Sequence, residues 1–109
     1  MIFAELRYVG HYDDRHDQLV ALLTKEFADI QSGHQGDSWI WVCADEQKVS
    51  IDTFSAMTHQ IKAEQASALV ARVIEVLSQE FKVEVFAQPE LESHEEARIE
   101  PASPYGSDR

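Results

Sequence analysis

The sequence has little of what marks exported or membrane proteins. Its 109 residues include one cysteine, Cys43, which cannot form an intramolecular disulfide, so nothing in the chain depends on an oxidising compartment. No apolar run approaches the length that spans a bilayer, and the first residues lack the basic-then-apolar order of a signal peptide. We therefore expect a cytoplasmic protein with no membrane partner.

Basic residues are also scarce. Nine lysines and arginines stand against 20 acidic residues, which gives a formal net charge of −11. Nucleic-acid-binding proteins gain much of their affinity from cations that neutralise phosphates. This chain has no basic stripe, so we expect no nucleic-acid partner. The acidity fits a solvated surface, or a protein that binds a basic partner in the manner of an inhibitor or immunity-type factor.

Glycine and proline are few, with four and three residues, and the prolines lie at positions 89, 101 and 104. Hydrophobic residues make up 44% of the chain, which is enough to form a folded core, and the length suits one domain rather than two. We predict an α/β domain over residues 1–88. An acidic, proline-containing C-terminal tail follows over residues 89–109.

Hydrophobic periodicity predicts the elements of that domain. Residues 2–9, 38–45, 48–55 and 82–88 have the pattern of β-strands, and residues 14–30 and 64–81 have apolar positions at helical spacing. We expect Gly33 to end the first helix in the left-handed conformation, and Pro89 to end the last strand. The order β-α-β-β-α-β predicts a ferredoxin-like α+β sandwich, a four-stranded antiparallel sheet with both helices on one face.

Alternation along the strands predicts which side chains face the helices. The predicted helix-facing set is aliphatic: Ile2, Ala4, Leu6, Ile40, Val42, Val49, Ile51, Val83 and Val85. The predicted binding or dimer face is rich in aromatic rings and consists of Phe3, Arg7, Trp39, Trp41, Asp52, Phe54 and Phe86. Five rings on an uncovered face exceed the apolar area that a monomer usually exposes. We expect a second copy of the chain, the C-terminal tail or a flat apolar ligand to cover them.

One cluster has the residue types of a metal site. His11, Asp13 and His16 lie in a short stretch between the first strand and the first helix, and imidazole and carboxylate groups bind zinc, iron or manganese. The five-residue separation of the histidines is not a recognised ligand spacing. The favoured interpretation is a helix N-terminus capped by aspartates, so these residues are only weak metal candidates and no cofactor is predicted.

A second cluster has the residue types of a hydrolase. Asp52, Ser55, Thr58 and His59 lie at the end of the third predicted strand and in the loop after it. No glycine-flanked elbow surrounds Ser55, so we interpret the cluster as ordinary loop capping and predict no catalytic residues. Cys43 is interpreted as a small packed side chain.

These observations favour a small non-catalytic binding or regulatory module that forms a homodimer through its aromatic sheet face. One alternative is a small-molecule sensor or small enzyme that uses Arg7, Asp52 and His59 on the open side of the sheet. The other is the acidic inhibitor of a basic protein partner. The predicted fold does not choose between them, because the same fold carries many functions.

Overall fold

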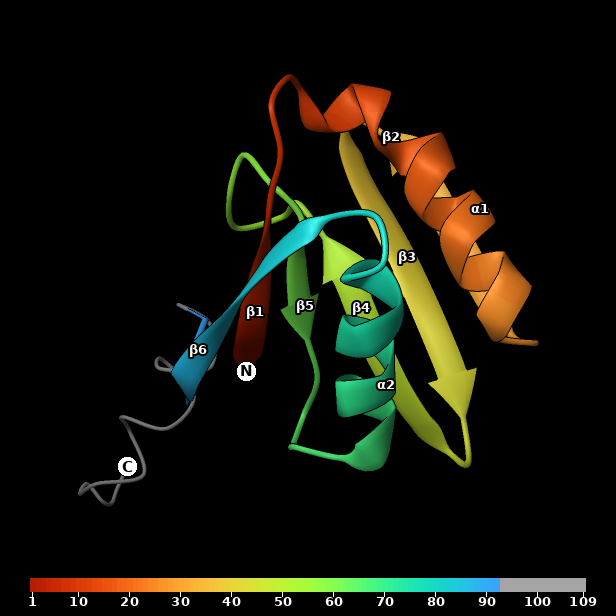
Figure 1. The fold of residues 1–109 in the computed structure, drawn as a ribbon, viewed down its shortest axis with the longest axis vertical. Coiled ribbons are helices and arrows are strands. Elements are labelled where there is room, and N and C mark those ends of the chain that lie inside the picture. The colour runs from red at the N-terminus through yellow and green to blue at the C-terminus, as the bar shows by residue number, and fades with distance from the viewer. Residues whose placement is uncertain (93–109) are drawn as a thin grey trace, which may run out of the picture.

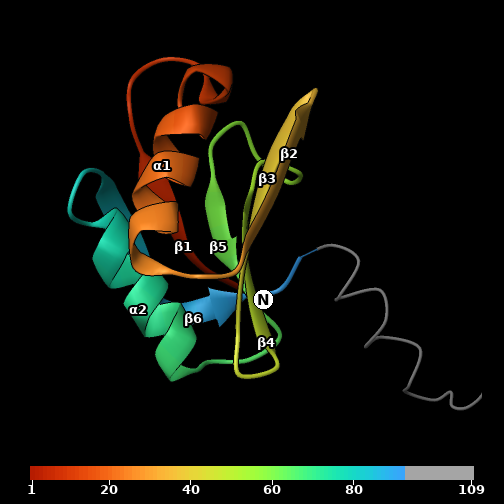
Figure 2. The same ribbon diagram turned by 90° about the vertical axis from the view of Figure 1, so that its right-hand side faces the viewer.

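The computed structural model describes residues 1–92, which form an α+β arrangement of one sheet and two helices (Figure 1). The strands are β1 (Ile2–Arg7), β2 (Ile30–Gln35), β3 (Asp37–Ala44), β4 (Gln47–Asp52), β5 (Gln60–Lys62) and β6 (Lys82–Glu90). The helices are α1 (His16–Glu26) and α2 (Ala68–Leu77), and a 3-10 turn, η1 (Tyr12–Asp14), precedes α1. Figure 2 shows both helices on the same side of the sheet.

In the described part of the chain, the sheet has six strands in the order β2-β3-β4-β5-β1-β6, and every neighbouring pair is antiparallel. The prediction of four strands was therefore wrong. β5 lies between β4 and β1, where the predicted ferredoxin-like order pairs those two strands directly, and β2 extends the sheet beyond β3. An antiparallel sheet with two helices on one face is confirmed, but the ferredoxin-like order is not.

β2 occupies residues that were predicted as the end of the first helix and a turn. α1 ends at Glu26, and the following residue, Phe27, is already extended with φ −129° and ψ 140°. The chain then pairs with β3 from Ile30 to Gln35 across a tight turn in which Gly36 has a φ of 79°. Gly33 lies inside this strand, so the prediction that it closes a helix was wrong.

The helices place aliphatic stripes on the sheet. α2 is shorter than predicted and begins at an N-cap, Ser67, whose side chain accepts a hydrogen bond from the backbone of Val70. The buried helix positions are Leu19, Leu22 and Leu23 of α1 and Val70, Val73, Val76 and Leu77 of α2. They pack on the sheet positions that alternation assigned to the core, with Ile40, Val42 and Ile51 fully buried. Ile61 of the short β5 is fully buried among them.

The pairing of β1 with β6 is irregular and overturns three predictions. Ile2 pairs with Glu90 and Ala4 with Val85, so an advance of two residues along β1 corresponds to five residues along β6. Phe3, at this interruption, is buried in the core cluster rather than on the open side. Val85 is exposed, because β6 is an edge strand. Pro89 lies within β6 instead of ending it, which an edge strand tolerates.

After β6, Leu91 and Glu92 are the last described residues, and the predicted tail beyond them, residues 93–109, lies outside the described part of the chain. In residues 1–92, no helix has the length and apolarity needed to cross a membrane.

Candidate functional site: the open sheet face and a buried histidine network

The face of the sheet opposite the helices, the open face, carries a pair of tryptophans. Trp39 and Trp41 project from β3 on the side opposite Ile40 and Val42, and both are half-buried. Their ring centroids are 4.7 Å apart at an interplanar angle of 43°. The Nζ atom of Lys48 on β4 lies 4.1 Å from the Trp41 ring centroid, within cation–π range.

Gly33 gives Trp39 its position. The two residues are cross-strand partners, and a Cβ atom built on Gly33 would lie 2.5 Å from atoms of the Trp39 ring. The indole therefore lies flat across the glycine, in space that any other side chain would occupy. From the sequence this glycine was assigned to a turn, and its role in leaving room for the Trp39 ring was missed.

Beside Trp39 the surface is hollowed. The hollow has a volume of about 470 Å³ and is lined by Gly33, His34, Gln35, Asp37, Trp39 and Phe54. Phe54, in the loop after β4, is 58% exposed. The carboxylate of Asp37 accepts a hydrogen bond from the Thr53 hydroxyl at 3.1 Å. Trp39, Trp41 and Phe54 form the aromatic patch, which the hollow borders.

The remaining two predicted rings do not join this patch. Phe3 is buried in the core, and Phe86 is half-buried on β6, which β4, β5 and β1 separate from β3. The predicted five-ring face is therefore corrected to a three-ring patch at the β3 end of the sheet.

Charged pairs occupy the open face between the patch and β6. Arg7 forms ion pairs with Glu5 at 2.7 Å and with Glu84. Asp52 and Lys62 are buried and form an ion pair at 2.7 Å. Lys62 also pairs with Glu92, which brings the chain after β6 across to β5. The predicted contact residues Arg7 and Asp52 are thus bound to neighbours within the chain.

A groove of about 720 Å³ runs beside the Asp52–Lys62 pair. Cys43 and Lys48, which are cross-strand partners, both line it. Cys43 is half-buried, so it is neither the fully packed thiol predicted from the sequence nor a freely exposed one.

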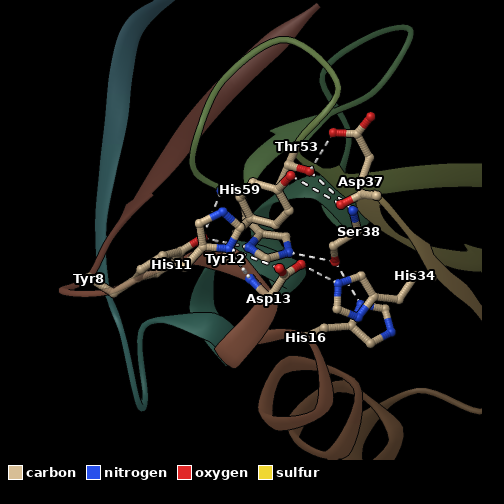
Figure 3. Close-up of polar contacts among 11 residues, drawn as sticks. Tyr8, His11, Tyr12, Asp13, His16, His34, Asp37, Ser38, Thr53 and His59 are labelled. Atoms are coloured by element: carbon tan, nitrogen blue, oxygen red, sulfur yellow. Dashed lines mark hydrogen bonds and ion pairs between the residues drawn. The ribbon is translucent and has the colours of Figure 1, made fainter.

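On the helix side of the sheet, a buried network joins three elements (Figure 3). The Oγ atom of Ser38, at the start of β3, lies 2.6 Å from His16 Nδ1 on α1 and 2.7 Å from His59 Nε2 before β5. His59 Nδ1 lies 2.8 Å from the hydroxyl of Tyr8. Because the serine hydroxyl has one hydrogen, it donates to one imidazole and accepts from the other. The network thus ties the start of α1 to the sheet.

Burial lowers the pKa of both imidazoles in the network. For His59 burial is the main cause, the nearby His16 and His34 add to it, and the pKa falls to about 4. The pKa of His16 is also below its usual value, mainly through burial and then through His34, whose ring stacks on it at 4.7 Å. Burial raises the pKa of Tyr8. At neutral pH the network is therefore uncharged.

The network has the residue types of a nucleophile and its base, but not the access. Ser38 and His59 have no exposed surface, so a substrate carbonyl has no path to the hydroxyl. The cluster considered in the sequence is also dispersed. Ser55 donates to Glu92, and Thr58 donates to the Leu6 carbonyl.

The three weak metal candidates do not converge either. His11 is exposed and accepts a hydrogen bond from the backbone of Asp13 as the N-cap of η1. The N-cap of α1 is Arg15, which makes no side-chain capping bond, so the prediction that an aspartate caps this helix was wrong. Asp13 bonds to His34 at 2.6 Å, which lowers the pKa of that carboxyl. His16 points into the buried network instead. Within residues 1–92, no group of three or more histidine, cysteine or acidic side chains has the arrangement of a metal site.

Comparison with known proteins adds no relative. No family model, curated protein or solved structure matches the chain.

Proposed function

We propose that this chain is a non-catalytic protein-binding module that contacts its partner through the aromatic patch. The observation that carries the proposal is the contrast along the open face. At the β3 end, Trp39, Trp41 and Phe54 leave aromatic surface accessible beside a hollow. Toward β6, the charged side chains form ion pairs with one another. Aromatic rings are enriched at protein interfaces, whereas such ion pairs add little to affinity.

The polar network on the helix side supports a binding role over an enzymatic one. Its serine bonds to both buried histidines, and both ring nitrogens of His59 have partners inside the fold. The residues of the sensor or enzyme alternative are also separated, since His59 lies on the helix side and Asp52 on the open side. Buried networks of this kind specify the packing of elements.

Site-specific photo-crosslinking tests the proposal. Phe54→p-benzoylphenylalanine is placed in the patch, and Val85→p-benzoylphenylalanine is its matched control, because these two side chains are 58% and 57% exposed. Both proteins are irradiated alone and in an extract of the source cells. We expect a discrete adduct from position 54 that disappears when Trp39→Ser and Trp41→Ser are added, and no adduct from position 85.

The mass of that adduct distinguishes the partners. An adduct of twice the chain mass, formed by the purified protein, supports the predicted homodimer, and a different mass formed in the extract supports another protein. Equal adducts from both positions, or none from position 54, would overturn the proposal.

A further inference from the structure

The hollow beside Trp39 combines three groups that suit a long cationic side chain. An indole and a phenyl ring form apolar walls, and the Asp37 carboxylate lies at the same hollow. Lysine and arginine match this combination, because their alkyl stems pack on rings while their charged ends seek a carboxylate. A purely apolar side chain would leave that carboxylate without a counter-charge.

The molecule already shows this mode of contact once. Lys48 places its ammonium over Trp41, the neighbouring indole of the same pair. Trp39 has the same orientation toward the open face and borders the hollow rather than Lys48. We call the two adjacent indoles the platform. The Trp41 half of this platform already binds a cation from within the chain, the Lys48 ammonium.

β2, next to this platform, is an open sheet edge. Within residues 1–92 it pairs with β3 on one side only, and its six residues, IQSGHQ, contain no lysine, acidic residue or proline. β6, the opposite edge, carries Lys82, Glu84, Pro89 and Glu90 and pairs irregularly with β1. Charge, proline and bulges are the devices that prevent strand addition. The edge beside the aromatic patch lacks them, and the edge far from it has them.

We propose that β2 and the hollow together bind an extended, basic segment of a partner protein. The segment pairs with the free edge of β2 as a seventh strand, and one of its lysine or arginine side chains enters the hollow, between Trp39 and Phe54 and toward Asp37. This inference deepens the proposed function, on which it rests, by naming the chemistry of the partner. The net charge of −11 attracts such a segment and speeds its association.

A second copy of the chain fits this site less well. Pairing β2 with β2 places together two strands that lack lysine and arginine, so it brings neither side chain to either hollow. It also joins two molecules that each carry a net charge of −11, which opposes association. Charge complementarity therefore selects a basic segment.

A synthetic peptide tests the proposal. The probe is an octapeptide of alternating lysine and valine, and its matched control alternates glutamate and valine. The chain has only two tryptophans, both in the patch, so their fluorescence reports binding at this site directly. We expect the lysine peptide to change the emission in a saturable way and the glutamate peptide to leave it unchanged.

Two variants separate the hollow from general charge attraction. Asp37→Asn keeps an oxygen that accepts from Thr53 but removes the charge, and Asp17→Asn removes one exposed charge from α1 on the other side of the sheet. We expect Asp37→Asn to weaken lysine-peptide binding about threefold to fivefold, the upper part of the range for an ion pair that stays in contact with water. Asp17→Asn should change lysine-peptide binding less than twofold. Calorimetry provides a second measurement of both changes.

Backbone pairing is tested with N-methylated probes. In a strand, alternate amides point to opposite edges, so methylation of either the lysine or the valine nitrogens removes the hydrogen bonds to β2, and the other pattern leaves them intact. We expect one of the two methylated peptides to lose binding and the other to keep it.

Three results would overturn the inference: no binding of the lysine peptide, equal losses from Asp37→Asn and Asp17→Asn, or no difference between the two methylated peptides. None of them contradicts the proposed function if the photo-crosslink at position 54 persists. In that case the patch binds a partner of other chemistry.

Discussion

The ring of His59 is fully buried and has a hydrogen-bond partner at each nitrogen, Tyr8 on one side and Ser38 on the other. Neither partner carries a charge that would stabilise an imidazolium. The low pKa of this histidine is therefore a property of the folded state, since the unfolded chain exposes the ring to water. Folding and protonation of His59 are linked.

We predict that this linkage weakens the fold in mild acid. Below pH 6.5 the unfolded chain takes up a proton at His59, while the folded chain does so only near pH 4, so the free energy of unfolding falls as the pH drops between these values. The full loss is about 3 kcal/mol, from about 1.4 kcal/mol for each unit of pKa. Urea unfolding of the wild type and of His59→Gln, from pH 7 to pH 4.5, measures it.

His59→Gln retains a polar side chain but does not titrate, so its stability should vary less steeply with pH than that of the wild type. His11→Gln changes an exposed histidine and serves as the control, for which we expect the wild-type slope. Parallel curves for the wild type and His59→Gln would contradict the prediction.

At the scale of the element, the stability of β2 as a strand depends on its contacts with β3 more than on the β-propensity of its own residues. Gly33→Ala would place a methyl group 2.5 Å from the Trp39 ring, so the indole must move or the strands must separate. We expect a loss of about 1–3 kcal/mol, as in other overpacked sites, together with a shift of tryptophan emission. Urea unfolding followed by fluorescence measures both.

Ser32→Ala, one position earlier in β2 on an exposed residue, is the matched control and should leave both quantities close to the wild type. If Gly33→Ala behaves like this control, the indole does not depend on the glycine for its position.

The same strand explains why the sequence predicted only part of the fold. The two helices and the strands now labelled β1, β3, β4 and β6 have clear periodicity, and their residues were predicted to within a few positions. β2 has one aliphatic residue, Ile30, and β5 has three residues in all, so neither has a period to detect. Both are strands because neighbouring strands supply their hydrogen bonds.

Of the two candidate sites, one was predicted from the sequence and the other was not. Alternation along β3 was enough to predict that Trp39 and Trp41 face away from the helices. The buried network was not predicted, because Ser38 is 22 residues from His16 and 21 from His59. The histidine–aspartate motif drew attention to His16, but its partners are set by tertiary structure. Polar residues at the ends of buried strands were the available signal.

At the scale of the whole molecule, Lys62 joins segments that are distant in sequence. It lies on β5, pairs with Asp52 on β4, and reaches Glu92 after the edge strand β6. All three side chains are largely buried, so the Lys62 ammonium offsets the cost of burying the Asp52 carboxylate. The ammonium thereby fixes the course of the chain after β6 across the open face.

We predict that Lys62→Met lowers the free energy of unfolding by about 3–5 kcal/mol, because it leaves the buried carboxylate of Asp52 without its lysine partner. Adding Asp52→Asn to Lys62→Met should recover part of the loss. Lys82→Met, on an exposed lysine of β6, is the control with little expected effect. Urea unfolding of the four proteins decides the matter, and equal losses from Lys62→Met and Lys82→Met would contradict the prediction.

The close approach of the two indoles has an optical consequence. At a centroid separation of 4.7 Å and an inclination of 43°, the transition dipoles of Trp39 and Trp41 couple and split their absorption into a pair of circular dichroism bands of opposite sign. That signal belongs to one end of one sheet face, whereas backbone bands average over every strand and helix. Denaturation curves recorded at the wavelengths of the coupled indole bands and at those of the backbone bands therefore separate local unfolding around β3 from global unfolding.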